Sequence, residues 1–191
     1  MGPQEGPNLE AFDTTWVLSL NEAANANGGL KALAQFFSHR MLLWPLGILL
    51  PLFAYIFKSP KIWHVFWSMV LATILTDPLC HQVLKPLFAR ARPCQVMDAI
   101  VALENCGTGF SLPSNHAANG MSLAIAALLV WRPKVQEGLP VLLFGMCVGL
   151  SRVFVGVHYP SDVLAGWTVG LVMGAVAAWV VRWNVRPATS D

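Results

Sequence analysis

Five long apolar stretches dominate the sequence and limit the folds that this chain can adopt. They cover Met41 to Phe57, Ile62 to Leu84, Pro113 to Trp131, Leu139 to Val157 and Asp162 to Val181. Each is close to the length of about 20 residues that an α-helix needs to cross the hydrocarbon core of a bilayer. Hydrophobic residues make up 55% of the chain and charged residues only 12%. We therefore expect an all-α, polytopic membrane helical bundle with five transmembrane helices.

The first 40 residues have a different pattern. Between Leu9 and Phe37, apolar and aromatic residues are mixed with acids, asparagines and the pair Gly28-Gly29. Such an interrupted amphipathic segment favours two short helices at the membrane interface, and a sixth span is the alternative. At 191 residues, the chain is expected to form a single integral-membrane domain over residues 1–191, with residues 1–40 as its interfacial N-terminal segment.

Basic residues in the short connections predict the orientation. They lie between the first and second spans, between the third and fourth, and after the fifth: Lys58, Lys61, Arg132, Lys134, Arg182 and Arg186. The positive-inside rule assigns this side to the cytoplasm. The N-terminal segment, the loop over residues 85–112 and the turn around His158 then lie on the opposite face. We expect a multi-pass protein of the cell (inner) membrane whose polar residues gather on the extracytoplasmic, periplasmic face.

Three short polar clusters lie at that face. They are Lys85 with Arg92 and Pro93, then Pro113 to His116, then Ser151 and Arg152 with His158 and Asp162. A single Lys or His near the end of a span is often only a headgroup contact or a packing residue. Three clusters on one membrane face indicate more than this. Cationic donors suit a phosphate, and two histidines suit the nucleophile and the acid of a phosphoryl transfer.

The three clusters, in their order along the chain, resemble the motifs of the type 2 phosphatidic acid phosphatase family. They read Lys-x6-Arg-Pro, Pro-Ser-x-His and Ser-Arg-x5-His-x3-Asp. Asn115 stands where the family usually has glycine. The short chain, the sequence Arg92 to Cys94 and the run Ser114 to Asn119 look most like the bacterial undecaprenyl diphosphate phosphatases. The resemblance implies a helical membrane core and hydrolysis of a lipid phosphate.

The resemblance also implies a role for each polar residue. His158 is the expected nucleophile, which forms a phosphohistidine, and Asp162 holds the other nitrogen of its ring. His116 is the expected general acid and then general base. The implied phosphate-binding residues are Lys85, Arg92, Ser114, Asn115 and Arg152. No metal or other cofactor is expected, because these motifs lack the carboxylate cluster that a magnesium ion prefers.

The implied substrate is a lipid phosphate or diphosphate within the bilayer, with undecaprenyl diphosphate as the first choice. Phosphatidylglycerol phosphate, phosphatidic acid and lipid A 1-phosphate are alternatives, as is a lipid phosphotransferase that passes the phosphoryl group to an acceptor lipid. A noncatalytic anion transporter would use the cations, but it would not need His158 and Asp162 four residues apart. A net charge of +2 does not indicate a nucleic acid partner, and the oligomeric state is left open.

The four cysteines fall into two groups. Cys80 and Cys147 lie within predicted spans and are expected to be small buried residues. Cys94 and Cys106 share the loop assigned to the extracytoplasmic side, where the environment is oxidising. We predict a disulfide between Cys94 and Cys106, and two free thiols in a reducing compartment are the alternative.

Two further charged residues lie near the motifs. Arg90 falls inside the variable stretch of the first motif, and we expect at most a contact with lipid headgroups from it. Asp77 precedes Pro78 inside the second predicted span. An acid at that depth is a functional candidate, but we prefer the prediction that it is the partner of a buried donor.

Overall fold

The computed structural model describes residues 9–39 and 41–184, and all the regular secondary structure in these residues is helical. Two helices, α1 (Leu9–Ala26) and α2 (Gly28–Ser38), form the N-terminal segment. The elements that follow are α3 (Trp44–Ile56), α4 (Pro60–Pro78), the π-helical turn η1 (Leu79–Leu84), α5 (Lys85–Phe88), α6 (Pro93–Val96), α7 (Asn115–Trp131), α8 (Val135–Phe154) and α9 (Pro160–Asn184). The predicted all-α membrane bundle is confirmed.

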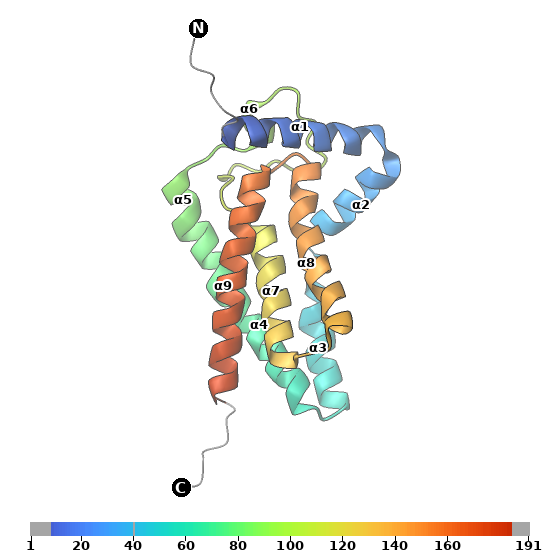
Figure 1. Cartoon of the computed structure of the whole chain (residues 1–191), viewed down its shortest axis with the longest axis vertical. Helices are drawn as coiled ribbons and strands as arrows, with labels where there is room; N and C mark the ends of the chain where they lie inside the picture. The colour runs from blue at the N-terminus through green and yellow to red at the C-terminus, as the bar shows by residue number, and fades with distance from the viewer. Residues whose placement is uncertain (1–8, 40, 185–191) are drawn as a thin grey trace.

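The helices form an upright bundle with one helix across its end. Figure 1 shows α4, α7, α8 and α9 running along the long axis, while α1 lies across the end at which α9 begins. The segment Leu9 to Phe37 therefore forms two helices, as predicted, and α1 does not run along the bundle. The connections between α3 and α4 and between α7 and α8 lie toward the opposite end (Figure 1).

The position of α1 follows from its buried face. Asp13, Val17, Asn21 and Ala24 are buried, at the spacing of three to four residues that places side chains on one face of a helix. Val17 belongs to an apolar cluster with Val163 of α9. The side-chain amide of Asn21 donates to Phe154 O at 3.0 Å and so satisfies a carbonyl at the end of α8. These contacts fix α1 over the ends of α8 and α9.

Within residues 9–39 and 41–184, three helical stretches are long and apolar enough to cross a membrane. They are Pro60–Val96, Val135–Phe154 and Pro160–Trp183, with 37, 20 and 24 residues. The other two predicted spans are shorter helices, because α3 has 13 residues and α7 has 17. At a rise of 1.5 Å per residue, 13 residues reach only about 20 Å, and the hydrocarbon core is roughly 30 Å thick.

The predicted span from Ile62 to Leu84 is one helical path with a change of winding. Ser59 caps α4 through its side chain, and Pro60 takes the first position, where its missing N–H costs nothing. At Pro78 the helix continues as η1, because proline cannot donate to the preceding turn and its ring loosens the regular hydrogen-bond ladder. The path then reaches Lys85, the first residue of α5.

A seam of small residues joins α9 to α7. Gly166, Gly170 and Gly174 follow one another at intervals of four, and each faces a backbone carbonyl of α7 or its cap. A Cβ atom added at Gly166 would lie 2.6 Å from Ser114 O, which is closer than real Cβ contacts. Small residues at this spacing let two membrane helices approach at backbone distance. The seam thereby places the start of α7 beside the start of α9.

Candidate active site

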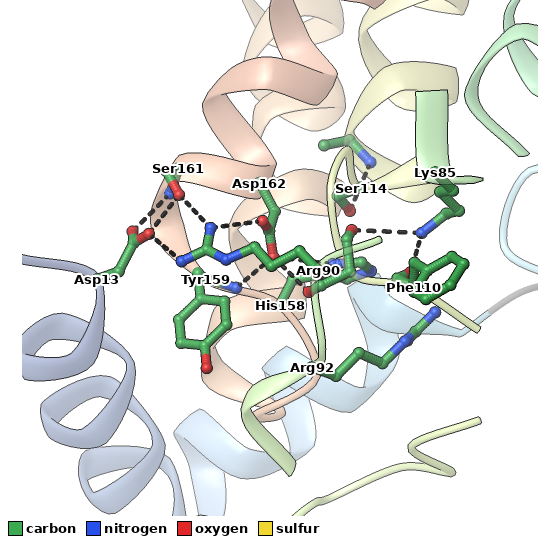
Figure 2. Close-up of polar contacts among 12 residues, drawn as sticks. Asp13, Lys85, Arg90, Arg92, Phe110, Ser114, His158, Tyr159, Ser161 and Asp162 are labelled. Atoms are coloured by element: carbon green, nitrogen blue, oxygen red, sulfur yellow. Dashed lines mark hydrogen bonds and ion pairs between the residues drawn. The ribbon is translucent and has the colours of Figure 1, made fainter. Parts of the chain in front are cut away.

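The three polar clusters meet at the end of the bundle that α1 covers. Each is carried by the end of a helix. Lys85 begins α5, Ser114 caps α7, Arg152 lies in the last turn of α8, and Asp162 lies in the first turn of α9. Ser114 N donates to Asp162 O at 3.0 Å, which joins the second cluster to the third. Figure 2 shows Lys85, Ser114, His158 and Asp162 grouped together.

His158 and Asp162 form a buried pair with Ser111. The His158 Nδ1 atom lies 3.4 Å from Asp162 Oδ2 and 3.2 Å from Ser111 Oγ. The Ser111 hydroxyl donates to Asp162 Oδ2, as does Tyr159 N at 2.9 Å. Since both neighbours of Nδ1 are oxygens, the ring proton belongs on Nδ1. The other ring nitrogen, Nε2, then carries a lone pair that is available for attack on phosphorus.

The surroundings of His158 keep its ring neutral. Burial lowers the pKa of His158 to about 3, although the hydrogen bond and charge of Asp162 act in the opposite direction. The residue is 2% exposed, and Asp162 is fully buried. At neutral pH the ring is therefore unprotonated at Nε2 and held by Asp162, which is the state that a nucleophilic histidine requires.

Lys85 contacts the loop that carries Ser111, and Ser111 in turn contacts His158 and Asp162. Its Nζ donates to Phe110 O and, at 3.3 Å, to Ser111 O. The ammonium therefore fixes the backbone of the loop that presents Ser111 to His158. Ser111 is buried and was not identified in the sequence, because it lies two residues before the second motif and its partners follow it by 47 and 51 positions.

Arg92 and Arg152 bring two more positive charges to this end. Arg92 Nε donates to Gly109 O at 2.9 Å. Arg152 is buried, and its Nη1 pairs with Glu104 at 2.7 Å and donates to the hydroxyl and carbonyl oxygens of Ser38. The Nε atom of Arg152 is buried without a hydrogen-bond partner among the described residues. A buried donor without a partner is costly, so this guanidinium has hydrogen-bonding capacity left for an anion.

The start of α7 presents both a helix terminus and a histidine. Ser114 Oγ accepts from Ala117 N, and the first backbone hydrogen bond of the helix runs from Ala118 N to Ser114 O at 2.9 Å. The amides of Asn115 and His116 precede that bond, so they are the donors that a helix N-terminus offers to an anion. His116 is half-buried, and it is close enough to His158 for a charge on one ring to act on the other.

The side chain of Asn115 has a different partner from the one that its predicted role suggests. Its amide donates to Asp77 Oδ1 at 3.0 Å, and the amide of Asn119 donates to the same oxygen at 3.1 Å. The preferred prediction for Asp77, that it is the partner of a buried donor, is correct in that Asp77 accepts hydrogen bonds from two side chains, but Asn115 and Asn119 are only partly buried. Contact between the Asn115 side chain and a phosphate stays a prediction, and its backbone amide is the better placed donor.

The expectation for Arg90 is wrong. Its guanidinium is not a headgroup contact, because Nη1 pairs with Asp162 Oδ1 at 2.9 Å and Nη2 pairs with Asp13 Oδ2 at 2.6 Å. The same group lies 4.0 Å from the centre of the Tyr159 ring (Figure 2). No local spacing in the sequence indicates this contact, because Asp13 and Asp162 lie 77 and 72 positions from Arg90.

Cys94 and Cys106 are joined by a disulfide, with their Cα atoms 6.1 Å apart. The disulfide closes the loop between the two cysteines. Arg92 lies two residues before this loop and Gly109 three residues after it, so the disulfide keeps close together the two residues that the Arg92 Nε–Gly109 O hydrogen bond joins. Of the other two cysteines, Cys80 is buried and Cys147 is partly buried.

Within residues 9–39 and 41–184, no three His, Cys, Asp or Glu side chains gather as a metal-binding group. The expectation that the chemistry needs no metal stays a prediction. The groups that are present are a neutral histidine held by a carboxylate, a second histidine, three cations and a helix N-terminus. This set can bind a phosphoryl group and transfer it.

Comparison with known proteins agrees with this arrangement. Residues 61–186 match the PAP2 superfamily. The chain is 33% identical to a lipid A 4'-phosphatase of Bacteroides thetaiotaomicron over 155 residues, which is 75% of this chain and 67% of that protein. It is also 33% identical to an undecaprenyl-diphosphatase of Sulfolobus acidocaldarius over 167 residues, which is 86% of this chain and 74% of that protein.

A solved structure supports the same assignment. The crystal structure of LpxE from Aquifex aeolicus matches with a TM-score of 0.64 and 25% sequence identity, over 91% of this chain and 96% of that one. The predicted family is confirmed, and the chain belongs to the PAP2 superfamily of membrane lipid phosphatases.

Proposed function

We propose that this chain hydrolyses a lipid phosphate or diphosphate through a phosphohistidine at His158. The observation that carries the proposal is the buried group of His158, Asp162 and Ser111, which leaves Nε2 as the free nucleophile. In the first step, the Nε2 lone pair forms a bond to phosphorus while the bond from phosphorus to the leaving oxygen breaks. His116 gives its proton to that oxygen.

The second step returns the enzyme to its starting state. A water molecule attacks the phosphorus atom of the phosphohistidine, and His116, now neutral, takes a proton from it. The nitrogen–phosphorus bond breaks, its electron pair returns to Nε2, and inorganic phosphate leaves. For a lipid monophosphate the first product is the lipid alcohol, and for a lipid diphosphate it is the lipid monophosphate.

Cations and amides stabilise the charge on the transferred group. Lys85, Arg92 and Arg152 surround the site, and the role of Arg152 is supported by its Nε atom, which has no hydrogen-bond partner within residues 9–39 and 41–184. The described hydrogen bond of the Arg92 guanidinium uses Nε alone, so its two outer amino groups can bind phosphate oxygens in a fork. Ser114 and Asn115 contribute at the N-terminus of α7, where the helix dipole favours negative charge.

Two adjoining apolar cavities support a lipid as the substrate. They lie between α3, α4 and α7, the first also against Val141 and Phe144 of α8, and have volumes of about 520 and 540 Å³. Asn119 lines the second cavity, one helical turn after His116. A hydrocarbon chain in this space would leave its phosphate at the start of α7, beside the nucleophile. An apolar space along the same helix whose start carries His116 fits an amphiphile.

Undecaprenyl diphosphate is the first candidate substrate. The motif details and the similarity to an undecaprenyl-diphosphatase favour it. A phosphate of lipid A is the second candidate, because an equally similar relative is a lipid A 4'-phosphatase. Phosphatidylglycerol phosphate, phosphatidic acid and transfer to an acceptor lipid are the remaining alternatives.

We place the active site on the extracytoplasmic face of the inner membrane. Basic residues at the far end of the bundle and the disulfide between Cys94 and Cys106 support this orientation. The test is labelling of intact cells with a membrane-impermeant maleimide after mild reduction. Labelling of these two cysteines before lysis supports the orientation, whereas labelling only after lysis contradicts it.

The decisive experiment measures phosphate release by the purified protein in detergent with EDTA present. The substrates are undecaprenyl diphosphate, lipid A, phosphatidylglycerol phosphate and phosphatidic acid, without acceptor lipid. We expect release from at least one of them, and we expect His158→Ala to lower kcat by about 1,000-fold or more. His116→Ala should lower kcat by roughly 100-fold, since it removes proton transfer but leaves the nucleophile.

The matched control is His64→Ala, which removes a half-buried histidine near the start of α4, far from the site. It should keep kcat within twofold or so of wild type, because it touches none of the reacting groups. Phosphate release by His158→Ala at rates close to wild type would overturn the mechanism. Release only when an acceptor lipid is added would favour the phosphotransferase instead.

A further inference from the structure

The catalytic carboxylate of Asp162 has two oxygens with separate partners. Oδ2 faces His158 Nδ1 and accepts from Ser111 and from Tyr159 N. Oδ1 accepts from Arg90 Nη1 at 2.9 Å. One oxygen of the carboxylate therefore contacts the nucleophile, and the other accepts a hydrogen bond from Arg90, which is not one of the motif residues.

Arg90 is itself held from the other side. Its Nη2 donates to Asp13 Oδ2 at 2.6 Å, and its Nη1 also donates to Ser161 Oγ at 2.7 Å. Asp13 is fully buried on α1, and its Oδ1 accepts from Ser161 N at 2.9 Å. Figure 2 shows the guanidinium lying between the carboxylates of Asp13 and Asp162. A single cation thus bridges α1 to the first turn of α9.

The geometry separates Arg90 from the phosphate-binding cations. Both of its outer amino groups are used by carboxylates, and one face of the guanidinium lies against the Tyr159 ring. It has no outward fork to offer to a phosphate, in contrast to Arg92. Its contact is with the group that orients the nucleophile, so it acts on the reaction through Asp162.

Two buried carboxylates near one another repel and are costly without a shared cation. Arg90 supplies that cation, and its planar fork fixes the plane of the Asp162 carboxylate through Oδ1. Without this contact, Oδ1 loses its partner, and only the hydrogen bonds of Ser111 and Tyr159 N to Oδ2 hold the carboxylate that faces His158 Nδ1. Without Asp13, Arg90 loses the anchor that holds it in the plane of Asp162.

We propose that Arg90 and Asp13 are positioning residues that orient the Asp162–His158 pair, so that docking of α1 on the bundle completes the active site. This inference rests on the proposed function, because it assigns these residues to the formation of the phosphohistidine. It gives the N-terminal segment a part in the chemistry, although α1 carries none of the family motifs. A simple anchor for α1 is the competing explanation.

The test uses single-turnover measurements on the purified full-length protein, with the substrate that the wild type hydrolyses. Phosphohistidine is trapped by alkaline quench, and its rate of formation is compared in wild type, Arg90→Ala, Arg90→Lys, Asp13→Asn and the control Glu22→Gln. Glu22 is an exposed acid on the same helix α1. All rates are normalised to monodisperse, folded protein measured by gel filtration and circular dichroism.

We expect Arg90→Ala to slow phosphohistidine formation by about 100-fold and Asp13→Asn by about tenfold, with KM within roughly twofold of wild type. Arg90→Lys should retain part of the rate, because one ammonium can still contact Asp162. Millimolar guanidinium should restore part of the rate of Arg90→Ala, and equal concentrations of sodium chloride or urea should not. Glu22→Gln should behave as wild type.

Unchanged phosphohistidine formation in folded Arg90→Ala and Asp13→Asn, with only a lower melting temperature, would overturn the proposal and leave a structural anchor. A rise in KM without a fall in kcat would also overturn it, because that pattern belongs to a phosphate-binding residue. The failure of the proposed function looks different. In that case His158→Ala retains phosphate release, and no phosphohistidine is trapped even in wild type.

Discussion

The two sides of α7 are packed in opposite ways. Toward α9, glycines at positions 166, 170 and 174 face the α7 backbone with no room for a Cβ atom. Toward α3 and α4, two adjoining cavities of about 520 and 540 Å³ are lined mainly by aliphatic and aromatic side chains. One helix therefore has a seam packed at backbone distance on one side and open apolar space on the other.

The difference matches the demands that a lipid phosphatase makes. On the tight side, Ser114 N donates to Asp162 O, so a hydrogen bond joins the start of α7 to the first turn of α9, which carries the carboxylate that holds the nucleophile. Positions of catalytic groups must be fixed closely, because small displacements are costly in rate. On the open side, a flexible hydrocarbon chain needs volume more than fixed contacts. The comparison therefore separates a face for chemistry from a face for the lipid.

The largest effect is expected from adding one methyl group to the tight side. In Gly170→Ala, the new Cβ atom would overlap the Ala118 carbonyl oxygen and lie 2.9 Å from Met121 Cβ. Since the obstacle is backbone, α7 and α9 must separate, and we expect a loss of about 2 kcal/mol in unfolding free energy. Thermal unfolding in detergent measures this loss, and kcat should fall with it because the seam sets the position of Ser114.

A melting temperature equal to that of wild type in Gly170→Ala would show that the seam tolerates a methyl group. The two sides of α7 would then not differ in the way described. A loss of stability with unchanged kcat would keep the seam but separate it from the positioning of the active site.

Most of the fold was accessible from the sequence because the bilayer imposes simple rules on helix length and composition. The apolar runs predicted α4 together with η1, α8 and α9 within a few residues, and capping explains where α4 and α7 begin. Ser59 and Pro60 start α4 two residues earlier than the hydrophobic run, and Ser114 starts α7 after Pro113. The length of α3 was overestimated, because the hydrophobic run also includes residues 41–43 and 57, which form turns and are not part of the helix.

Only some residues of the active site could be predicted from the sequence. Residues of the motifs were found because their order is a pattern along the chain. Ser111, Glu104 and Asp13 were missed because their roles depend on contacts with residues 48 to 148 positions away. Arg90 was assigned to the headgroups because basic residues near the end of a span often contact headgroups, and this expectation takes no account of a distant acid such as Asp13. Such pairings follow from packing and not from any local spacing.

An intermediate effect is expected from filling the open side. Leu50 lines both cavities, so Leu50→Trp places a large ring in the space assigned to the hydrocarbon chain. We expect KM for a long-chain lipid phosphate to rise by roughly tenfold, with little change for a short-chain phosphate that does not reach the cavities. Initial rates on a chain-length series in detergent measure this effect.

The adjacent residue offers a matched control for the cavity. Leu49 is exposed and lines neither cavity, so Leu49→Trp adds the same ring on the face of α3 that suits lipid contact. It should leave KM unchanged for every chain length. Equal effects of the two substitutions would contradict a lipid chain in the cavities, because the ring would then act only by perturbing α3.

The smallest effect, and one of opposite sign, is expected from a methyl group on the open side. Gly47 lies within α3, lines the second cavity and has no atom within 4 Å of an added Cβ. Alanine favours the helix over glycine, so Gly47→Ala should raise unfolding free energy by about 0.5 kcal/mol, whereas Gly170→Ala lowers it. The same thermal unfolding assay measures both. A lower unfolding free energy in Gly47→Ala would mean that another helix packs against Gly47 in the membrane. The two sides of α7 would then not differ in packing.

A stable Gly47→Ala variant with a raised KM for long-chain substrates would instead indicate that the lipid chain lies against the backbone of α3.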